Sequence, residues 1–325
     1  MIFDSIYWVI THNCNDKCDH CYNGSAPKGV SLTAPEARSL IANFPEPEEA
    51  PKRIIISGGE PLVVKGLLYE ILDVLYDRYG DSTQYMLQTN GDMLKGEILD
   101  ELLARHITRI DIASIDRFHR QKGTRAAVLQ ELMESHGMVY DNEGALVSED
   151  RLTKPTPSFS MWGANEEFWI GGNWPRGRAL STDVWLSNPE HNFCAITSGA
   201  KGFAGSDEQH PQEVAIQLYN LYPCCPGTKM PIADLREEKL NDAIDRIASH
   251  PMWRALNDGN PWKMGEHLGV TEEEAKKRTT ELGSICLWCD EFFANHYEDY
   301  HEDTSAPHLN LHRNTNALIQ IALPE

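Results

Sequence analysis

Three cysteines stand close together near the start of the chain, in the segment CNDKCDHCYN. They are Cys14, Cys18 and Cys21, with three and then two residues between them. Three thiolates can hold three irons of a [4Fe–4S] cluster and leave the fourth iron open to another ligand. A zinc ion would need a fourth ligand, either from a distant part of the chain or from His20 in the same loop. The loop therefore predicts a metal site and leaves the metal open.

A glycine pair and a carboxylate end a later apolar run, in the segment IIISGGEPL. The motif comprises Gly58, Gly59, Glu60 and Pro61. Paired glycines at the end of a strand let the backbone approach a ligand closely, and the adjacent carboxylate can bind an ammonium group. Taken alone, this peptide is more typical of a plain glycine turn.

The second half of the chain contains five of the eight cysteines: Cys194, Cys224, Cys225, Cys286 and Cys289. In a reducing compartment, clustered cysteines favour metal binding or catalysis over disulfides. Four thiolates suit either structural zinc or a fully ligated [4Fe–4S] cluster. A second metal site is therefore expected, with one cysteine to spare.

The composition is that of an ordinary globular protein. The 325 residues are 41% hydrophobic and 24% charged, with a formal net charge of -20. So acidic a chain argues against nucleic acid as an obligatory partner, because phosphate binding needs basic surface. We find no apolar run long enough to span a membrane and no signal-peptide pattern, so a cytoplasmic protein is expected.

Strands and helices alternate in the first part of the chain. Apolar, β-branched runs predict strands at residues 5–13, 52–59, 84–91 and 109–116, and helical patterns follow at 31–44, 67–80, 98–107 and 124–137. Thr33 is placed to cap the first helix and Gly80 to end the second. Such repeated strand–helix units predict a parallel sheet with its chemistry at the carboxyl ends of the strands.

This alternation weakens after Gly137. We expect a loop at 139–157 and a fifth strand at 158–164. At the level of domains, we expect a core domain over residues 1–188, a smaller cysteine-bearing domain over 189–300 and a tail over 301–325. The tryptophan-rich stretch 162–185 suits either a substrate pocket or a domain interface, and its charged members are Glu166, Glu167, Arg176 and Arg178. The acidic, His-rich run HYEDYHED is expected to be solvated surface.

The first two motifs together resemble the signature of the radical S-adenosylmethionine (radical SAM) family. That signature is CxxxCxΦC, with His20 here at the Φ position, followed by GGEP after the second strand. QTNG and ASID also resemble the family's strand ends. The resemblance implies a partial (β/α)6 barrel, with a [4Fe–4S] cluster in the loop after the first strand.

The resemblance also implies a cofactor site. The open iron would chelate the amino and carboxylate groups of SAM, and reductive cleavage would give a 5′-deoxyadenosyl radical that abstracts a hydrogen atom from a substrate. The residues implied in binding SAM are His20, Gly58, Gly59, Glu60, Pro61, Gln88, Asn90 and Ser114. The last three are equally suited to be ordinary strand-end hydrogen-bonding residues. A one-electron donor such as flavodoxin or ferredoxin is an implied partner.

The cysteines of the second half resemble the SPASM/twitch extension of radical SAM enzymes. The similar features are a lone cysteine, a YPC segment, an LREE stretch before a helix and a final CxxC. This implies one auxiliary [4Fe–4S] cluster held by Cys194, Cys224, Cys286 and Cys289. Cys225 would then be a buried apolar side chain or a thiol hydrogen donor in catalysis, and Arg178, in a GRA segment also seen in relatives, is a further catalytic candidate.

Two kinds of substrate are compatible with this chemistry. A small molecule of the sugar, aminocyclitol or nucleoside type would be oxidised, with the auxiliary cluster accepting an electron. A ribosomally made peptide would instead be crosslinked, epimerised or oxidised. Peptide maturases often carry an extra N-terminal domain that binds the leader peptide. Because the first strand here begins near Ile6, we do not expect such a domain on this chain, and the small molecule is favoured as the substrate. A non-catalytic iron–sulfur or zinc protein is the hypothesis from another class, and the GGEP motif argues against it.

Overall fold

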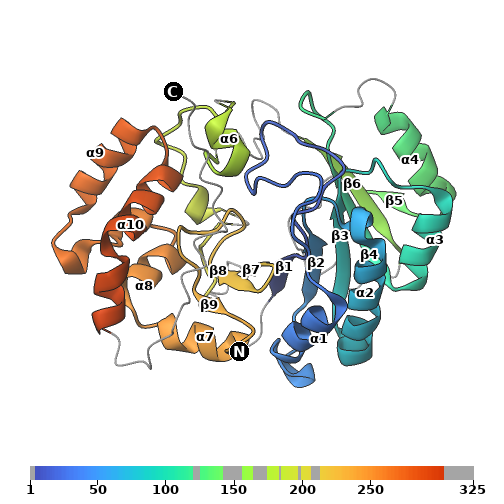
Figure 1. The fold of residues 1–325 in the computed structure, drawn as a ribbon, viewed down its shortest axis with the longest axis horizontal. Coiled ribbons are helices and arrows are strands. Elements are labelled where there is room, and N and C mark those ends of the chain that lie inside the picture. The colour runs from blue at the N-terminus through green and yellow to red at the C-terminus, as the bar shows by residue number, and fades with distance from the viewer. Residues whose placement is uncertain are drawn as a thin grey trace.

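The computed structural model describes residues 4–119, 125–141, 156–163, 174–182, 184–196, 199–205 and 213–303. Residues 297–303 are described by their backbone only. Within these ranges the strands form one sheet, in the order β5-β6-β4-β3-β2-β1-β7-β8-β9 (Figure 1). Most neighbouring strands are parallel, and only the β7–β8 and β8–β9 pairs are antiparallel. The predicted α/β fold with a parallel-rich sheet is confirmed.

The predicted strand–helix units form the first half of the sheet. The strands are β1 (Ser5–Val9), β2 (Arg53–Ser57), β3 (Gln84–Thr89), β4 (Ile107–Ala113) and β6 (Ser158–Trp162). The helices are α1 (Ala34–Ala42), α2 (Lys65–Tyr79), α3 (Gly96–Ala104) and α4 (Arg125–Ser135). One detail was wrong: the stretch expected to be a loop from residue 139 begins with a short edge strand, β5 (Val139–Tyr140), which pairs with β6.

Local sequence explains where these elements begin and end. All five residues of β1 are buried, as expected for a parallel strand with both faces covered. The Thr33 side chain accepts a hydrogen bond from the backbone of Glu36, whose carboxylate accepts one in return, so a capping box starts α1. Gly80, with φ of 52°, ends α2 in a conformation that favours glycine.

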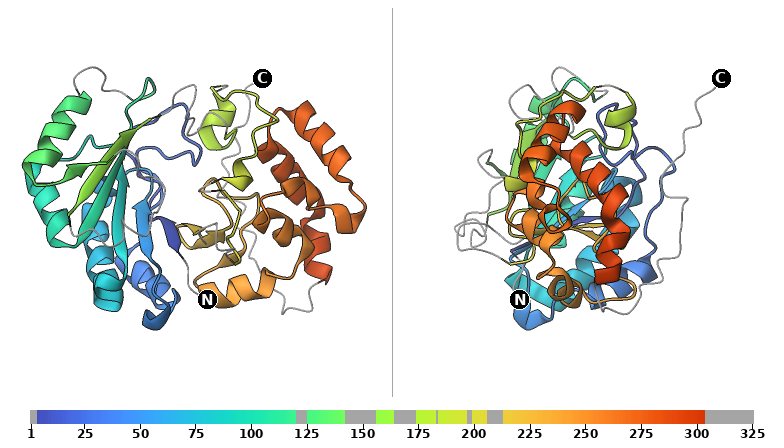
Figure 2. Two further views of the ribbon diagram at one scale, coloured as in Figure 1. Left: turned by 180° about the vertical axis from the view of Figure 1, so that it is seen from behind. Right: turned by 90° about the vertical axis from the view of Figure 1, so that its left-hand side faces the viewer.

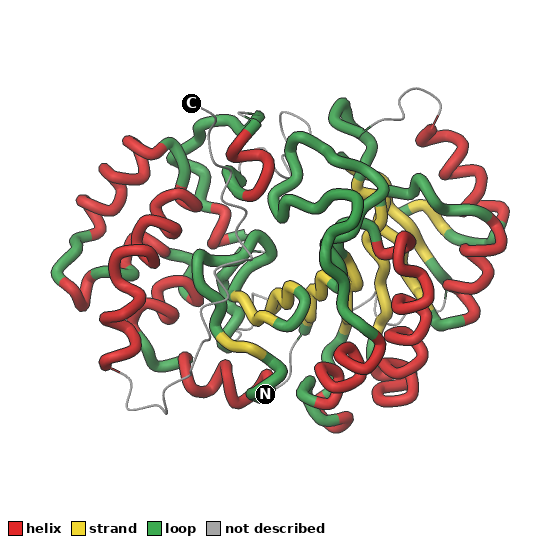
Figure 3. The backbone as a smooth tube through the Cα atoms, viewed as in Figure 1, coloured by secondary structure: helices red, strands yellow, loops and turns green. Residues whose placement is uncertain are grey.

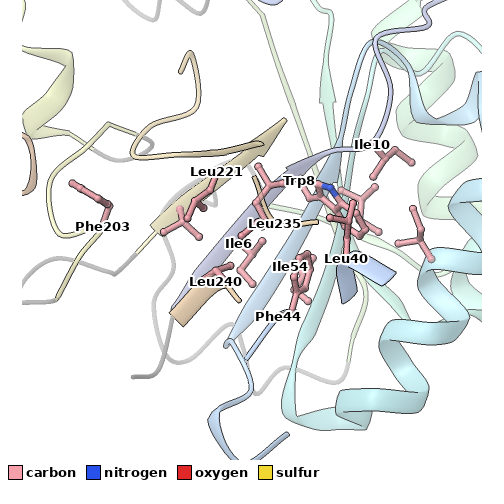
Figure 4. Close-up of a cluster of buried hydrophobic side chains, with 14 of the residues drawn as sticks. Ile6, Trp8, Ile10, Leu40, Phe44, Ile54, Phe203, Leu221, Leu235 and Leu240 are labelled. Atoms are coloured by element: carbon pink, nitrogen blue, oxygen red, sulfur yellow. The ribbon is translucent and has the colours of Figure 1, made fainter. Parts of the chain in front are cut away.

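The sheet continues into the second half of the chain. Strand β7 (Glu213–Gln217) lies parallel to β1 on the side opposite β2, and β8 (Asn220–Tyr222) and β9 (Ala233–Asp234) extend the edge. Figure 4 shows side chains of both halves in one apolar cluster, among them Ile6, Trp8, Leu221 and Leu240. The two halves therefore share a sheet and a core.

The remaining helices gather beyond β7–β9, away from α1–α4 (Figure 2). They are α6 (Gly177–Ser181), α7 (Leu240–Ile247), α8 (Pro251–Asn257), α9 (Glu272–Leu282) and α10 (Ile285–Asp303). Short 3-10 helices are η1 (Pro47–Glu49), η2 (Pro61–Val64), η3 (Gly80–Ser82), η4 (Phe193–Ala195), η5 (Pro261–Lys263) and η6 (Glu266–Leu268). Helix α10 crosses the expected start of the tail, and residues 304–325 lie outside the described ranges. In the described part of the chain, no helix is long and apolar enough to cross a membrane.

Candidate functional site

A cavity of about 220 Å³ lies where the parallel strands end. Its wall includes Cys14, Cys18 and Cys21 together with Gly58, Gly59, Thr89 and Asn90, which follow or end β2 and β3. The cavity also reaches side chains from within the strands, among them Tyr7, Arg53 and Asp111. The structure thus brings the two motifs singled out in the sequence to one cavity.

The three cysteines lie on a long irregular loop between β1 and α1, drawn mainly as a green tube in Figure 3. The Cys14 amide donates to Ala26 O at 3.2 Å, and the Cys14 sulfur accepts from the Asp16 amide at 3.4 Å. Burial raises the pKa of the Cys14 thiol to about 12, and it raises the pKa of Cys18 and Cys21 as well. Buried thiols of this kind need a cation to become thiolates, so the donor set suits a metal cofactor.

Sulfur spacing distinguishes a single ion from a larger cofactor. Zinc with Zn–S bonds of 2.3 Å places its sulfur ligands about 3.8 Å apart. Among the described residues, the group of three ligand atoms lying within 4.8 Å of one another is His20, Asp116 and His119, and it includes no cysteine. In the part of the chain that the structure describes, neither cysteine set therefore has three sulfur atoms as close together as the ligands of one ion.

Arg178 holds the cysteine loop from a distant part of the chain. Its guanidinium donates to the carbonyl oxygens of Cys18, Gly24 and Ser25, at 2.9 Å to Cys18, and its own amide donates to Cys21 O at 3.0 Å. Its side chain is not part of the cavity wall as described. These contacts give Arg178 a positioning role, and the direct catalytic role considered from the sequence stays a prediction.

The glycine pair packs against the segment between β1 and Cys14. The Gly59 amide donates to Thr11 O at 2.7 Å, and the Glu60 amide donates to Asn13 O at 2.9 Å. A Cβ on Gly58 would lie 2.7 Å from Thr11 O, and one on Gly59 would lie 2.5 Å from Asn13 O. Only glycine permits this backbone approach, so the pair sets the position of the loop as well as bordering the cavity.

Glu60 is fully buried and lies outside the cavity wall. Its carboxylate accepts hydrogen bonds from the Leu62 amide at 3.0 Å, the Thr89 hydroxyl at 2.8 Å and the Asn90 amide at 2.7 Å. Burial raises the pKa of Glu60 to about 6. The carboxylate thus joins the ends of β2 and β3, and its binding of an ammonium group stays a prediction. Pro61 opens η2 and is buried.

The other strand-end residues divide into two groups. Gln88 and Asn90 line the cavity, whereas Ser114 is buried and donates to Asn90 O at 2.6 Å. Gln88 accepts from the hydroxyls of Tyr7 at 2.7 Å and Ser57 at 2.9 Å. Ser114 therefore serves as a hydrogen-bonding residue behind the wall.

His20 lies on the cavity wall, as its place in the motif suggested. Its ring stacks on Phe118 with centroids 4.7 Å apart, and its Nδ1 is buried with no partner among the described residues. Burial lowers the pKa of His20 to about 4, so the ring is neutral at physiological pH. A neutral ring on the wall is available to stack against a planar ligand.

The second cysteine set gathers around Arg176. Cys194 lies on η4, Cys224 follows β8, and Cys286 and Cys289 lie one turn apart on α10. Burial raises the pKa of Cys194 well above its ordinary value, and the neighbouring Cys224, Cys286 and Cys289 raise it further. Arg176 forms an ion pair with Asp290 and donates to Cys286 O at 3.3 Å. One buried guanidinium thus lies beside four thiols.

Adjacent cysteines face different surroundings. Cys224 interacts with Arg176 and Cys286, whereas Cys225 lines the cavity and hydrogen-bonds the hydroxyls of Tyr7 and Tyr22. The geometry therefore assigns Cys224 to the four-cysteine set and leaves Cys225 beside the cavity. Glu166 and Glu167 lie outside the described residues.

Several cavity residues were not anticipated from the sequence. Arg53 is paired with Glu213 at 2.9 Å, and Asp111 accepts from Arg109 at 2.8 Å and Ser160 at 2.7 Å. The sequence did contain a signal for Arg53 and Asp111, because each is a charged residue inside an otherwise mostly apolar strand. His119 and Trp174 also line the cavity, and the indole Nε1–H of Trp174 donates to no described residue.

Comparisons with known proteins agree with this arrangement. Residues 8–142 match the model of the Radical SAM superfamily. The chain is similar to the AdoMet-dependent heme synthase of Methanosarcina barkeri, with 36% identity over 119 residues, which is 34% of this chain and 30% of that protein. It is also similar to the pre-heme d1 synthase of Dinoroseobacter shibae, with 36% identity over 103 residues, 30% of this chain and 23% of that one. The chain thus matches less than a third of the length of either relative.

Two solved structures share the fold. BtrN in complex with AdoMet and 2-DOIA has a TM-score of 0.52 at 16% identity, covering 84% of this chain and 91% of BtrN. Native anSMEcpe with bound AdoMet has a TM-score of 0.50 at 12% identity, covering 92% of this chain and 98% of that one. Both likenesses extend well beyond residue 142 into the cysteine-bearing second half.

Gly59→Ala should displace the cysteine loop. The added Cβ would overlap Asn13 O, and relieving such overpacking costs about 1–3 kcal/mol. We expect a lower urea midpoint and less iron bound after anaerobic reconstitution. Gly66→Ala is the matched control, because a Cβ there meets nothing within 4 Å. Wild-type iron content in Gly59→Ala would contradict the role assigned to the glycine pair.

Arg178→Gln should lower iron binding at the first cysteine set, because the loop loses its donors to three carbonyl oxygens. The measurement is iron per chain in a background that lacks the four cysteines of the second set. Arg254→Gln, on the exposed face of α8, is the control and should retain wild-type iron. Equal iron in both variants would show that the loop holds its shape without Arg178.

Cys224→Ser and Cys225→Ser should differ in iron content. The first variant removes a member of the four-cysteine set and should lose about four irons, the content of one cluster. The second removes a thiol that faces the cavity and should keep all its iron. Iron and sulfide analysis after reconstitution checks this, and the reverse pattern would exchange the roles of the two cysteines.

Proposed function

We propose that this chain, whose residues 8–142 match the Radical SAM superfamily, is a radical SAM enzyme that oxidises a small polar molecule. The proposed reaction begins with reductive cleavage of SAM and continues with abstraction of a substrate hydrogen atom. The observation that carries the proposal is the shared cavity: three cysteine thiols, the strand-end residues and polar side chains of the sheet all border it.

Cys14, Cys18 and Cys21 would hold the SAM-binding [4Fe–4S] cluster, which supplies the electron that cleaves SAM. The strand-end backbone at Gly58 and Gly59 and the side chains of Gln88 and Asn90 border the space where SAM would lie. His20, with its neutral ring, is suited to the planar part of SAM. Glu60 would support this site by fixing the ends of β2 and β3.

Cys194, Cys224, Cys286 and Cys289 would hold an auxiliary [4Fe–4S] cluster. Their burial and their spacing beyond that of a single ion support this assignment over zinc. The charge of Arg176 would balance part of the negative charge of the thiolates. Residues 189–300 would then act as the twitch-like domain, and an external donor such as flavodoxin or ferredoxin would reduce the clusters.

The cavity wall is mostly apolar, and the polar side chains set into it support a substrate that carries hydroxyl groups. Gln88, Ser57 and Tyr7 form one hydrogen-bonded group, and Arg53 and Asp111 are buried charged groups on the same wall. Such groups orient sugars, aminocyclitols or nucleosides better than apolar ligands. BtrN, which shares the fold, was solved with 2-DOIA bound. Maturation of a ribosomally made peptide remains the alternative, and a non-catalytic iron–sulfur protein would leave these polar side chains without a use.

A second outcome of the same chemistry is favoured by Cys225. Its thiol lines the cavity and contacts two tyrosine hydroxyls. A thiol so placed can return a hydrogen atom to a substrate radical, and the product would then be epimerised and not oxidised. Deuterium from D₂O would appear at the reacting carbon only in that case.

The proposed function predicts two linked losses in the Cys14/Cys18/Cys21→Ala variant. Iron per chain should fall from about eight to about four, and formation of 5′-deoxyadenosine from SAM with dithionite should stop. Iron and sulfide analysis and chromatography of the nucleoside measure these two quantities. Wild-type protein with about four irons and zinc would leave the oxidation without an electron acceptor.

A further inference from the structure

We infer that His119, oriented by Asp116, is the base that accepts the substrate proton during oxidation. The inference deepens the proposed function and rests on it. It concerns the segment after β4, which brings the imidazole of His119 to the cavity wall and places the Asp116 carboxylate behind it.

The two side chains form a hydrogen-bonded dyad. Asp116 Oδ1 lies 2.8 Å from Nδ1 of His119 and also accepts from the Phe118 amide at 2.8 Å. The Asp116 side chain is 1% exposed, and that of His119 is 9% exposed. Because a carboxylate only accepts, the proton of a neutral His119 lies on Nδ1, and Nε2 keeps its lone pair.

The free nitrogen belongs to a residue of the cavity wall. His119 borders the same cavity as Cys14, Cys18 and Cys21, and no described residue hydrogen-bonds its Nε2. His20 packs edge-on against it, with ring centroids 5.2 Å apart. An oriented, unoccupied acceptor at a ligand cavity has the geometry of a general base.

Most other acid–base groups of the wall are already engaged, and His20, whose Nδ1 has no described partner, is assigned above to the planar part of SAM. Asp111 accepts from Arg109 and Ser160, and Asp16 accepts from the Lys17 amide and the Cys18 thiol. The hydroxyls of Tyr7 and Tyr22 are neutral, because burial raises their pKa well above the ordinary value. His119 is therefore the wall residue best able to take a proton.

His20, Asp116 and His119 have ligand atoms close enough for a metal ion as well. The Asp116 oxygen that lies 2.8 Å from His119 Nδ1 also accepts a hydrogen bond from the Phe118 amide, and the dyad accounts for both of these bonds.

The chemistry defines the substrate as a secondary alcohol, or the corresponding amine. SAM and its cluster, when bound, would supply the radical that removes the hydrogen atom from the carbon bearing the hydroxyl or amino group. His119 Nε2 would accept the O–H or N–H proton of the substrate radical, and an oxidised iron–sulfur cluster would accept one electron, so that a C=O or C=N bond forms. One hydrogen atom, one proton and one electron leave the substrate, so the oxidation balances.

The test compares His119→Gln and Asp116→Asn with wild type, and uses His267→Gln, an exposed histidine on η6, as the control. Reconstituted proteins receive SAM, dithionite and perdeuterated myo-inositol, glucosamine or adenosine. Mass spectrometry measures deuterium in 5′-deoxyadenosine, which reports hydrogen abstraction, and the carbonyl product, which reports oxidation. Iron content and thermal midpoint establish that each variant is folded and loaded.

We expect His119→Gln to transfer deuterium within about twofold of wild type but to form carbonyl product about 100-fold more slowly, the usual loss on removal of a general base. Asp116→Asn should also raise the ratio of 5′-deoxyadenosine to carbonyl product, as His119→Gln does, because an amide at position 116 no longer fixes the tautomer of His119. A merely structural defect would lower both products together and leave that ratio unchanged.

The outcomes separate the inference from the proposed function. Normal carbonyl formation by His119→Gln would overturn the inference and leave the proposed function intact. Carbon-bound deuterium from D₂O in place of a carbonyl would assign the final step to Cys225. Stoichiometric zinc binding that is lost in His119→Gln would assign the dyad to a metal. No deuterium transfer from any probe in wild type would refute the small-molecule function and the inference with it.

Discussion

The arrangement depends on how a loop without secondary structure is held while it presents three thiols. Backbone polar groups that are removed from water need partners, and a long loop cannot supply all of them itself. Here the end of β2 donates to Thr11 O and Asn13 O, and Arg178 donates to carbonyl oxygens further along. The loop is therefore fixed from two sides. The glycine pair matters for this reason, since any side chain at Gly59 would separate the two backbones.

One short segment supports both cysteine sets. Arg178 binds the first loop, whereas Arg176, two residues earlier, lies beside the second set. Trp174 contacts Tyr22 with ring centroids 5.1 Å apart and Phe193 with centroids 4.6 Å apart, so it packs between the neighbours of Cys21 and Cys194. Figure 1 shows α6, which begins in this segment, beside the loop after β1. A shift of this segment would move both sites together.

Sequence patterns predicted the elements whose causes are local. Strands β1 to β4 and β6, the capping box at Thr33 and the glycine end of α2 all follow from neighbouring residues. The pairing of β7 with β1 could not be foreseen, because it joins residues more than 200 positions apart. Sequence patterns also could not show which cysteine of the pair after β8, Cys224 or Cys225, faces the cavity. Composition indicated that one of the two was spare, but only the turn of the backbone shows that Cys225 faces the cavity.

Buried charges on the cavity side of the sheet are better explained by function than by stability. Burying an ion pair such as Arg53–Glu213 costs desolvation that well-packed apolar residues would avoid. Arg109 and Asp111 repeat the situation on β4, and both pairs lie in strands whose other residues are largely apolar. A sheet selected only to fold would have little reason to keep them. Their place beside Gln88 and Tyr7 gives the cavity a fixed set of donors and acceptors. Such preorganised groups can hold a polar substrate in one position while the radical forms. A fixed position is needed because the radical must abstract one particular hydrogen atom and no other.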